Sequence, residues 1–241
     1  MTKILFSEGH GAGSRFNRGF IGGNEGDNNL KLSNAIYNYL SDRYDVELFG
    51  IRRDGENVDH SLSNRASMGA GNDLFYSVHS NAFNGSVSGV EIILSYQSKS
   101  YYHFAKGLTA LISRILGIQD RGVKFRNRSN GAFENYNQAS TRSSNWYGEL
   151  YNNRAKCAMI VEHFFHDNQR DINSYNINFN ELVEGIAKHI AEYFDLPPAQ
   201  KTSEIYYRVV TDSYKSIDNA KQRQKELADK GIETFIAPFE I

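Results

Sequence analysis

Short apolar runs alternate along this chain with segments whose apolar residues recur at helical spacing. The apolar runs have the length of buried strands rather than of helices. They lie at Lys3–Phe6, Asp45–Ile51, Asp73–Val78, Val87–Tyr96 and Cys157–Val161. Helical segments begin near Asn28, at Ser61 or Ser63, at Phe104 and at Glu181. This alternation predicts an α/β fold, a three-layer, mostly parallel twisted sheet with helices on both faces.

Three of the predicted strands lead to an ionisable side chain. Asp73–Val78 is followed directly by His79, and Cys157–Val161 is followed directly by Glu162. Lys3–Phe6 leads through a glycine-rich loop to His10. Glu25 lies further along that loop, ahead of the first predicted helix. Because the carboxyl ends of parallel strands share one edge of a sheet, where crevices form, we expect these side chains to gather there.

Two histidines and one glutamate are the ligand set of many catalytic zinc sites, and a further carboxylate can take a proton from the metal's water. The set therefore predicts metal-assisted amide hydrolysis, with Glu162 as the base at the end of a rigid strand. The spacing leaves an alternative open, because the residues are dispersed and no HExxH motif is present. They could be unrelated polar side chains: most histidines bind no metal, and an acid such as Glu25 favours a helix dipole.

His163 and His166 are rival ligands, since both follow Glu162 closely in the sequence. If the strand continues, His163 alternates to the face opposite Glu162. We expect His166 to face solvent. Neither is therefore placed in the predicted metal site.

The composition of the 241 residues is that of an ordinary globular protein, with 40% hydrophobic and 23% charged residues. A net charge of -1 argues against general nucleic-acid binding, which needs a basic face. No run approaches the roughly 20 apolar residues of a membrane span, and we expect no signal peptide at the N-terminus. The single cysteine, Cys157, is predicted to be a small buried hydrophobe, so no internal disulfide forms.

The segment Gln119–Asn153 is polar, rich in Asn, Arg, Ser and aromatic residues, and contains the only tryptophan. It predicts long loops over a cleft or, equally, a surface excursion without function. Beyond residue 196 the composition indicates a linker over 197–204, followed by a small unit over 205–241. That unit is predicted to form a strand at Ile205–Thr211, a helix at Asn219–Lys230 and a strand at Thr234–Ala237.

The order of motifs over Lys3–Phe194 resembles the zinc-dependent N-acetylmuramoyl-L-alanine amidases of the Amidase_3 type, found in bacterial autolysins and phage endolysins. The matching pieces come in the family's order: Gly9-His10-Gly11, Glu25 before Asn28-Asn29-Leu30, Arg52-Arg53-Asp54 with Leu62 and Arg65, Asp73–Ala82, Ser88-Gly89-Val90-Glu91, Arg121-Gly122-Val123-Lys124, and Met159-Ile160-Val161-Glu162 with Phe164 and Asn168. The resemblance implies that 1–196 is a zinc amidase domain.

By this resemblance, His10, Glu25 and His79 hold Zn2+, and Glu162 is the catalytic residue that activates water. Two departures from the family stand out. Ser7-Glu8 replaces the usual Asp-Pro before the first ligand, so a possible partner of a zinc ligand is missing. The stretch 126–153 matches poorly and is longer than usual, which suggests a wall of the substrate groove particular to this chain.

The tail, Ile205–Ile241, resembles one half of the sporulation-related repeat (SPOR), a wall-binding module. The similar pieces are Tyr207–Tyr214, Asn219-Ala220, Leu227 and Lys230-Gly231. Two strands and one helix bury too little surface to be stable alone, so we expect two tails to pair and make the enzyme a homodimer. A tail packed on its own catalytic domain is the alternative.

The function expected from these motifs is cleavage of the amide between N-acetylmuramic acid and L-alanine in peptidoglycan. Two alternatives stay open: another zinc peptidase, carboxypeptidase-like, acting on cell-wall peptides, and a non-catalytic wall-binding protein. Without a signal peptide we expect synthesis in the cytoplasm and action on the wall after release, through phage holin-type or mother-cell lysis.

Overall fold

The computed structural model describes residues 1–13, 20–52, 58–199, 213–232 and 234–236. They divide into two compact units, Met1–Gln200 and Lys201–Ile241. The roles expected for the two units, catalysis and wall binding or dimerisation, stay predictions.

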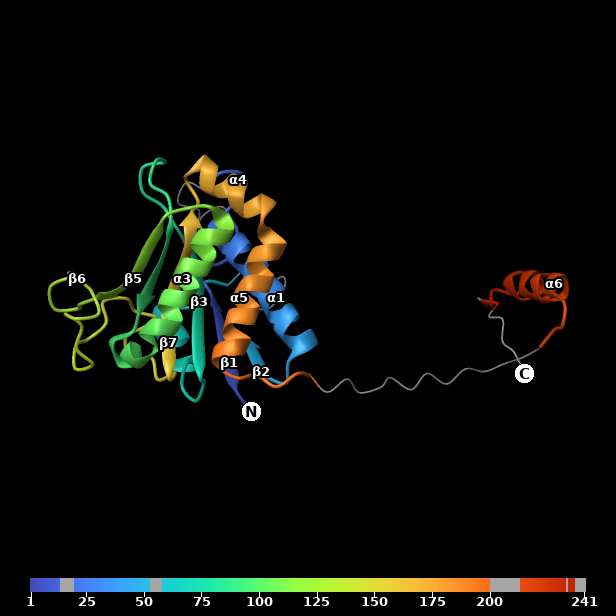
Figure 1. Ribbon diagram of the computed structural model, residues 1–241, viewed down its shortest axis with the longest axis horizontal. Helices are drawn as coiled ribbons and strands as arrows, with labels where there is room; N and C mark the ends of the chain where they lie inside the picture. The colour runs from blue at the N-terminus through green and yellow to red at the C-terminus, as the bar shows by residue number, and fades with distance from the viewer. Residues whose placement is uncertain (14–19, 53–57, 200–212, 233, 237–241) are drawn as a thin grey trace. The chain divides into compact units, whose positions relative to one another are not determined.

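The first unit is built on one sheet, which in the described residues has seven strands in the order β2-β1-β3-β7-β4-β5-β6 (Figure 1). The strands are β1 Lys3–Glu8, β2 Glu47–Gly50, β3 Leu74–Asn81, β4 Val90–Leu94, β5 Asp120–Arg126, β6 Phe133–Glu134 and β7 Cys157–Phe165. The four strands from β2 to β7 are parallel, and so are β4 and β5. The pairs β7–β4 and β5–β6 are antiparallel. The predicted mostly parallel α/β sheet is confirmed.

The main core lies between the sheet and three long helices, α1 Glu25–Arg43, α3 Tyr102–Leu116 and α5 Phe179–Tyr193, which lie over one face of the sheet (Figure 1). Successive strand residues point to opposite faces, so that face receives every second side chain of the central strands. The buried side chains that meet there include Ile4, Phe6, Tyr76, Met159, Val161, Leu32, Ile36, Leu108, Ile112, Ile186 and Ile190. Each such apolar side chain contributes about 1.5–3 kcal/mol by leaving water.

The opposite face has a smaller core and a thinner cover. Leu5, Phe75 and Ile160 from the strands pack there with Leu150 from the segment that precedes β7. The short helix α2, Leu62–Met68, packs against that segment, because Gly148 lies directly against the Leu62 side chain. The sheet therefore has helices on both faces, as predicted. Three long helices cover one face, and one short helix with loops covers the other.

Several elements differ in extent from the sequence-based expectation. Helix α1 begins at Glu25 rather than near Asn28, because the Asn24 side chain caps it by accepting a hydrogen bond from the Asp27 amide at 2.9 Å. Strands β3 and β7 continue past His79 and Glu162, which therefore lie within strands rather than after them.

Further elements lie where only loops or no element were expected. Strand β5 occupies Asp120–Arg126 within the polar segment, and its residues alternate between buried and half-buried from Val123 to Arg126. The sequence hides this strand because only one of its faces meets apolar neighbours. Helix α4, Gln169–Ile177, follows β7, and the 3-10 helix η2, Tyr96–Tyr101, precedes α3.

The predicted linker over 197–204 does not begin as a free segment. The Pro197 carbonyl accepts a hydrogen bond from the Asp45 amide at 2.8 Å, and the Ala199 amide donates to the Arg43 carbonyl at 2.8 Å. Residues 197–199 are thereby fastened to the first unit.

The second unit contains helix α6, Ile217–Ala228, which matches the helix expected at Asn219–Lys230. The strand expected at Ile205–Thr211 lies outside the described residues. Of the strand expected at Thr234–Ala237, residues 234–236 are described and are irregular, so the structure does not bear that strand out. Helix α6 buries none of its residues.

Throughout the part of the chain that is described, no helix combines the length and the apolar character needed to cross a membrane.

Candidate active site

The loop after β1 presents His10 in a left-handed backbone conformation, with φ of 62°. Two buried arginines hold the loop: Arg52 and Arg65 donate hydrogen bonds to the His10 carbonyl at 3.2 and 3.4 Å. Such a conformation costs a non-glycine residue on the order of 1–3 kcal/mol, so it persists only where surrounding contacts impose it. Although Ser7-Glu8 replaces the usual Asp-Pro before His10, these two arginines hold the backbone of His10 in place.

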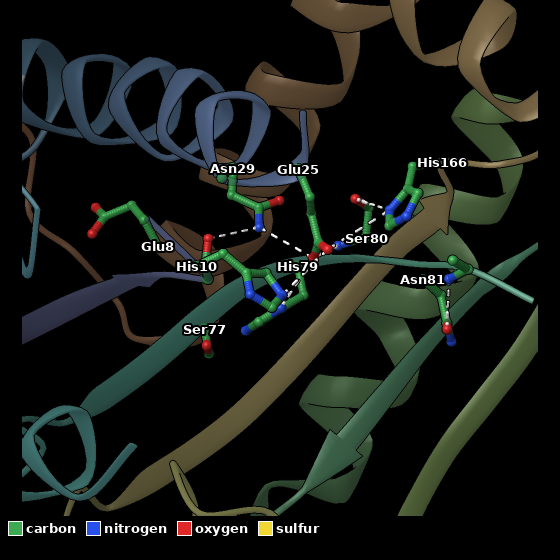
Figure 2. A network of polar contacts seen from close by, with 12 residues as sticks. Glu8, His10, Glu25, Asn29, Ser77, His79, Ser80, Asn81 and His166 are labelled. Atoms are coloured by element: carbon green, nitrogen blue, oxygen red, sulfur yellow. Dashed lines mark hydrogen bonds and ion pairs between the residues drawn. The ribbon is translucent and has the colours of Figure 1, made fainter. Parts of the chain in front are cut away.

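Glu25 is the first residue of α1, and its buried carboxylate lies between two histidines (Figure 2). Its Oε2 lies 3.3 Å from Nε2 of His10, and its Oε1 lies 3.2 Å from Nδ1 of His79. The Ser80 amide also donates to Oε1, at 3.3 Å. Burial alone would raise the pKa of Glu25, but the hydrogen bonds from the histidines outweigh it and lower that pKa far below its ordinary value.

His10, Glu25 and His79 converge on one point, as Figure 2 shows. One ligand atom from each lies within 4.8 Å of the other two. Two imidazole nitrogens and one carboxylate oxygen at this spacing fit a divalent metal of the zinc type, with room for a fourth ligand. The residues expected at one edge of the sheet are therefore brought together by β1, α1 and β3.

Gly9 makes the close approach of the two histidine-bearing segments possible. A Cβ atom at Gly9 would lie 2.2 Å from Cε1 of His79, so the ring of His79 packs directly against the glycine backbone. The imidazole rings of His10 and His79 meet edge to face, with centroids 5.3 Å apart.

We expect the Gly9→Ala substitution to push the His79 ring away from Glu25 and to weaken metal binding by about 10–100-fold. Competition with a chromogenic chelator measures this change. Gly23→Ala is the matched control, because a Cβ there makes an ordinary 3.5 Å contact with Phe20. An unchanged metal affinity in Gly9→Ala would contradict the close packing described above.

Glu162 lies on β7 at the position paired with His79 on β3. Its Oε2 is buried and has no hydrogen-bond partner in the described structure. Burial raises the pKa of Glu162 to about 8, opposed by nearby His79 and assisted by the carboxylates of Glu25 and Glu91. A carboxyl group of this kind beside a metal site can accept and return a proton near neutral pH.

The two rival histidines are both buried. Neither is one of the three converging ligands, although Nδ1 of His166 lies 3.9 Å from Oε2 of Glu25. His163 points to the other face, where Nδ1 donates to the His79 carbonyl at 3.0 Å and Nε2 lies 2.8 Å from the Tyr76 hydroxyl. Burial lowers the pKa of His163 to about 4, which keeps the ring neutral. The prediction that His166 faces solvent is wrong: its ring stacks on Phe20 and its Nδ1 lies 2.9 Å from the Ser80 hydroxyl.

Sequence reasoning missed Glu149, a buried carboxylate on the segment before β7. Its Oε1 lies 3.3 Å from Nε2 of His79, on the side of the ring away from Glu25. Burial alone would raise the pKa of Glu149, but His79 and, more weakly, Arg65 and Ser77 lower it to about 2. No motif or periodicity marks Glu149, since it lies in the stretch that matches the resembled family poorly.

The charges around His79 favour a bound cation. Burial opposes a charge on the ring, yet the hydrogen bonds to Glu149 and Glu25 raise the pKa of His79 well above its ordinary value. The negative charges of these two ionised carboxylates favour a proton on the ring, and for the same reason they favour a metal cation in place of that proton.

The fold and this cluster define an α/β protein with a candidate metal-dependent hydrolytic site at the edge of its sheet. The family model of the N-acetylmuramoyl-L-alanine amidases, Amidase_3, matches residues 4–192. The chain belongs to this family and is a peptidoglycan amidase. A search of curated proteins gave no significant match.

Solved structures share the fold. The catalytic domain of CwlV, an N-acetylmuramoyl-L-alanine amidase from Bacillus (Paenibacillus) polymyxa, is 19% identical with a TM-score of 0.64, over 81% of this chain and 99% of that one. An N-acetylmuramoyl-L-alanine amidase from Clostridium difficile 630 is 21% identical with a TM-score of 0.63, over 80% and 97% of the two chains. Cwp6 from Clostridium difficile is 24% identical with a TM-score of 0.62, over 80% of this chain and 29% of that one.

Proposed function

We propose that this amidase cleaves the bond between N-acetylmuramic acid and L-alanine with a zinc ion held by His10, Glu25 and His79, and with Glu162 as the catalytic residue. The observation that carries the proposal is the convergence of three ligand atoms within 4.8 Å beside a buried, unpartnered carboxylate oxygen of Glu162. Zinc is a small, borderline-soft ion that binds imidazole nitrogens and carboxylate oxygens, so this donor set fits it and leaves one position for water or substrate.

Zinc in such a site supplies Lewis-acid chemistry, acidifying water and polarising the scissile carbonyl. Glu162 takes the proton of the attacking water and returns it to the leaving amine. Its burial near other carboxylates raises its pKa and favours the protonated form, whereas the positive charge of a bound zinc would favour the ionised form, so the group can hold the proton between the two steps. Its place within β7 fixes the carboxylate while the proton moves.

The other residues at the site bind and orient. Arg52 and Arg65 fix the loop that carries His10, and α1 fixes Glu25. Arg121 and Lys124 both contact the Glu91 carboxylate, at 2.7 and 2.6 Å, on the strand next to Glu162. Both side chains remain partly exposed, and they are candidates for binding the acidic groups of the substrate.

The segment 126–153 is a candidate wall of the substrate groove. The Arg126 guanidinium lies 4.7 and 4.8 Å from the ring centroids of Trp146 and Phe133, which are both half-exposed. Backbone hydrogen bonds such as that from Trp146 to the Arg126 carbonyl tie the segment to β5. Because these contacts hold the segment on β5, we favour a wall of the substrate groove over a surface excursion without function.

Digestion of purified peptidoglycan tests the proposed function. We expect new N-terminal alanine without new reducing ends, loss of this activity after chelation and its return with zinc. Release of a C-terminal amino acid instead would support a carboxypeptidase-like enzyme. Wall binding without any released group would support a non-catalytic protein.

Action on the cell wall follows from the family, whereas release by holin-type or mother-cell lysis stays a proposal. Homodimerisation through 205–241 likewise stays a prediction that the described residues do not support.

A further inference from the structure

The two ring nitrogens of His79 face two different carboxylates. Nδ1 lies 3.2 Å from Oε1 of Glu25, on the side of the metal cluster, and Nε2 lies 3.3 Å from Oε1 of Glu149. The nitrogens of an imidazole point in divergent directions, so a metal held with His10 and Glu25 uses Nδ1. Nε2 is then left to Glu149.

Glu149 is held in place from two neighbouring strands. Ser77 on β3 donates to its Oε2 at 2.5 Å, and Ser7 on β1 donates to the same oxygen at 3.2 Å. Arg65 in turn donates to the Ser7 hydroxyl at 3.1 Å. Ser7 and Ser77 are register partners in the sheet, so the carboxylate is anchored to the same rigid strands that carry the histidines.

The backbone around Glu149 is also fastened. The Asn153 side chain donates to the Glu149 carbonyl at 3.0 Å and accepts from the Ala155 amide at 3.0 Å. The carboxylate is therefore delivered by a segment tied to the start of β7 and not by a free loop. Buried polar groups that are fully hydrogen-bonded in this way specify a single arrangement.

We propose that Glu149 is a positioning residue: it accepts the Nε2–H of His79, fixes that tautomer and ring orientation, and leaves the Nδ1 lone pair for zinc. This inference rests on the proposed zinc site and adds a residue to it. Carboxylates that orient ligating histidines through the second nitrogen raise the basicity of the ligand, and their loss weakens metal binding by about 10–100-fold.

The same geometry accounts for the serine at position 7. Its hydroxyl lies within hydrogen-bond distance of Glu149 and can donate to it. A carboxylate at position 7 would instead face the Glu149 carboxylate at that distance, and two like charges repel strongly in a buried site.

The tautomer of His79 in the wild-type, zinc-loaded full chain is the first test. We expect 15N chemical shifts of labelled histidine to show a proton on Nε2 and a metal-bound Nδ1. Two results would overturn the proposal without need of any variant. One is a proton on Nδ1, and the other is an Nε2 that titrates and carries no hydrogen-bonded proton.

Zinc affinity by chelator competition is the second test. We expect Glu149→Ala to bind zinc about 10–100-fold more weakly, and Glu149→Gln, whose carbonyl can still accept the proton, to recover part of the loss. Glu134→Ala is the matched control, a glutamate of the same segment whose carboxylate accepts a hydrogen bond from the Asn127 side chain at 2.9 Å. Equal affinities of wild type and Glu149→Ala would overturn the positioning role.

These outcomes separate the inference from the proposed function. A wild type that binds zinc and releases N-terminal alanine, with unchanged zinc affinity in Glu149→Ala, overturns only the role of Glu149. A wild type that binds zinc but releases no alanine overturns the proposed function, while the affinities still decide the role of Glu149. A wild type that binds no zinc overturns both.

Discussion

The Glu162→Gln variant is expected to lose about 10²–10⁴-fold of the amidase rate while it binds zinc as tightly as the wild type. The amide keeps the volume of the side chain but can neither take a proton from water nor return one to the leaving amine. Release of N-terminal alanine from purified wall measures the rate, and chelator competition measures zinc binding. A variant that remains as lytic as its parent would remove Glu162 from the mechanism.

Glu184→Gln is the matched control for this variant. Glu184 lies on α5, where its carboxylate contacts Lys188 at 2.6 Å and both side chains are about half-exposed. The same chemical change there should leave both the rate and the zinc affinity unaltered. A parallel loss in the control would point to a defect of the preparations and not to the proton transfer.

The same variant should change how the stability of the chelated protein depends on pH. The folded pKa of Glu162 is raised from its ordinary 4.5 to about 8, so the unfolded chain ionises first. The wild type therefore loses stability as pH rises from about 4.5 to about 8, and Glu162→Gln lacks this loss. Urea unfolding at pH 5 and pH 9 checks the difference, and equal pH dependence would contradict the raised pKa.

The Glu25→Gln variant is expected to show the largest loss of metal binding. It removes the carboxylate that contacts both His10 and His79, and with it the negative charge between the two rings. Loss of a ligand should exceed the roughly 10–100-fold loss that follows removal of a partner outside the ligand set. Calorimetric titration with zinc measures the affinity, and amidase activity should fall with it.

Asp27→Asn controls for the place of Glu25 on the first turn of α1. Asp27 is also acidic and near the helix dipole, but its carboxylate contacts the Asn24 side chain rather than a histidine. If Glu25 acted only through the helix dipole, the two substitutions would weaken the protein alike, by about 0.3–1 kcal/mol of stability, with zinc affinity unchanged.

Apolar runs and helical spacing were sufficient to predict the α/β sheet. Lys3–Phe6 and Cys157–Val161 are fully apolar except at one end, and such runs have few other places to be buried. The order of ionisable residues at the strand ends then indicated that His10, Glu25 and His79 lie together, and the three side chains do converge. Strand β5 escaped prediction because its alternation is confined to Val123–Arg126 and only one of its faces is apolar.

The local sequence determined most of the segments that become strands and helices, since periodicity and capping act between near neighbours, but it did not mark β5, η2 or α4. Tertiary structure decided the surroundings of the three candidate ligands. His166 directly follows a buried strand, and contacts with Phe20 and Ser80 from distant parts of the chain accompany its burial. Glu149 lies 70 residues from His79 in the sequence, and only the packing of the preceding segment on β1 and β3 brings its carboxylate to Nε2. Contacts over such separations depend on how elements pack, and no local pattern encodes them.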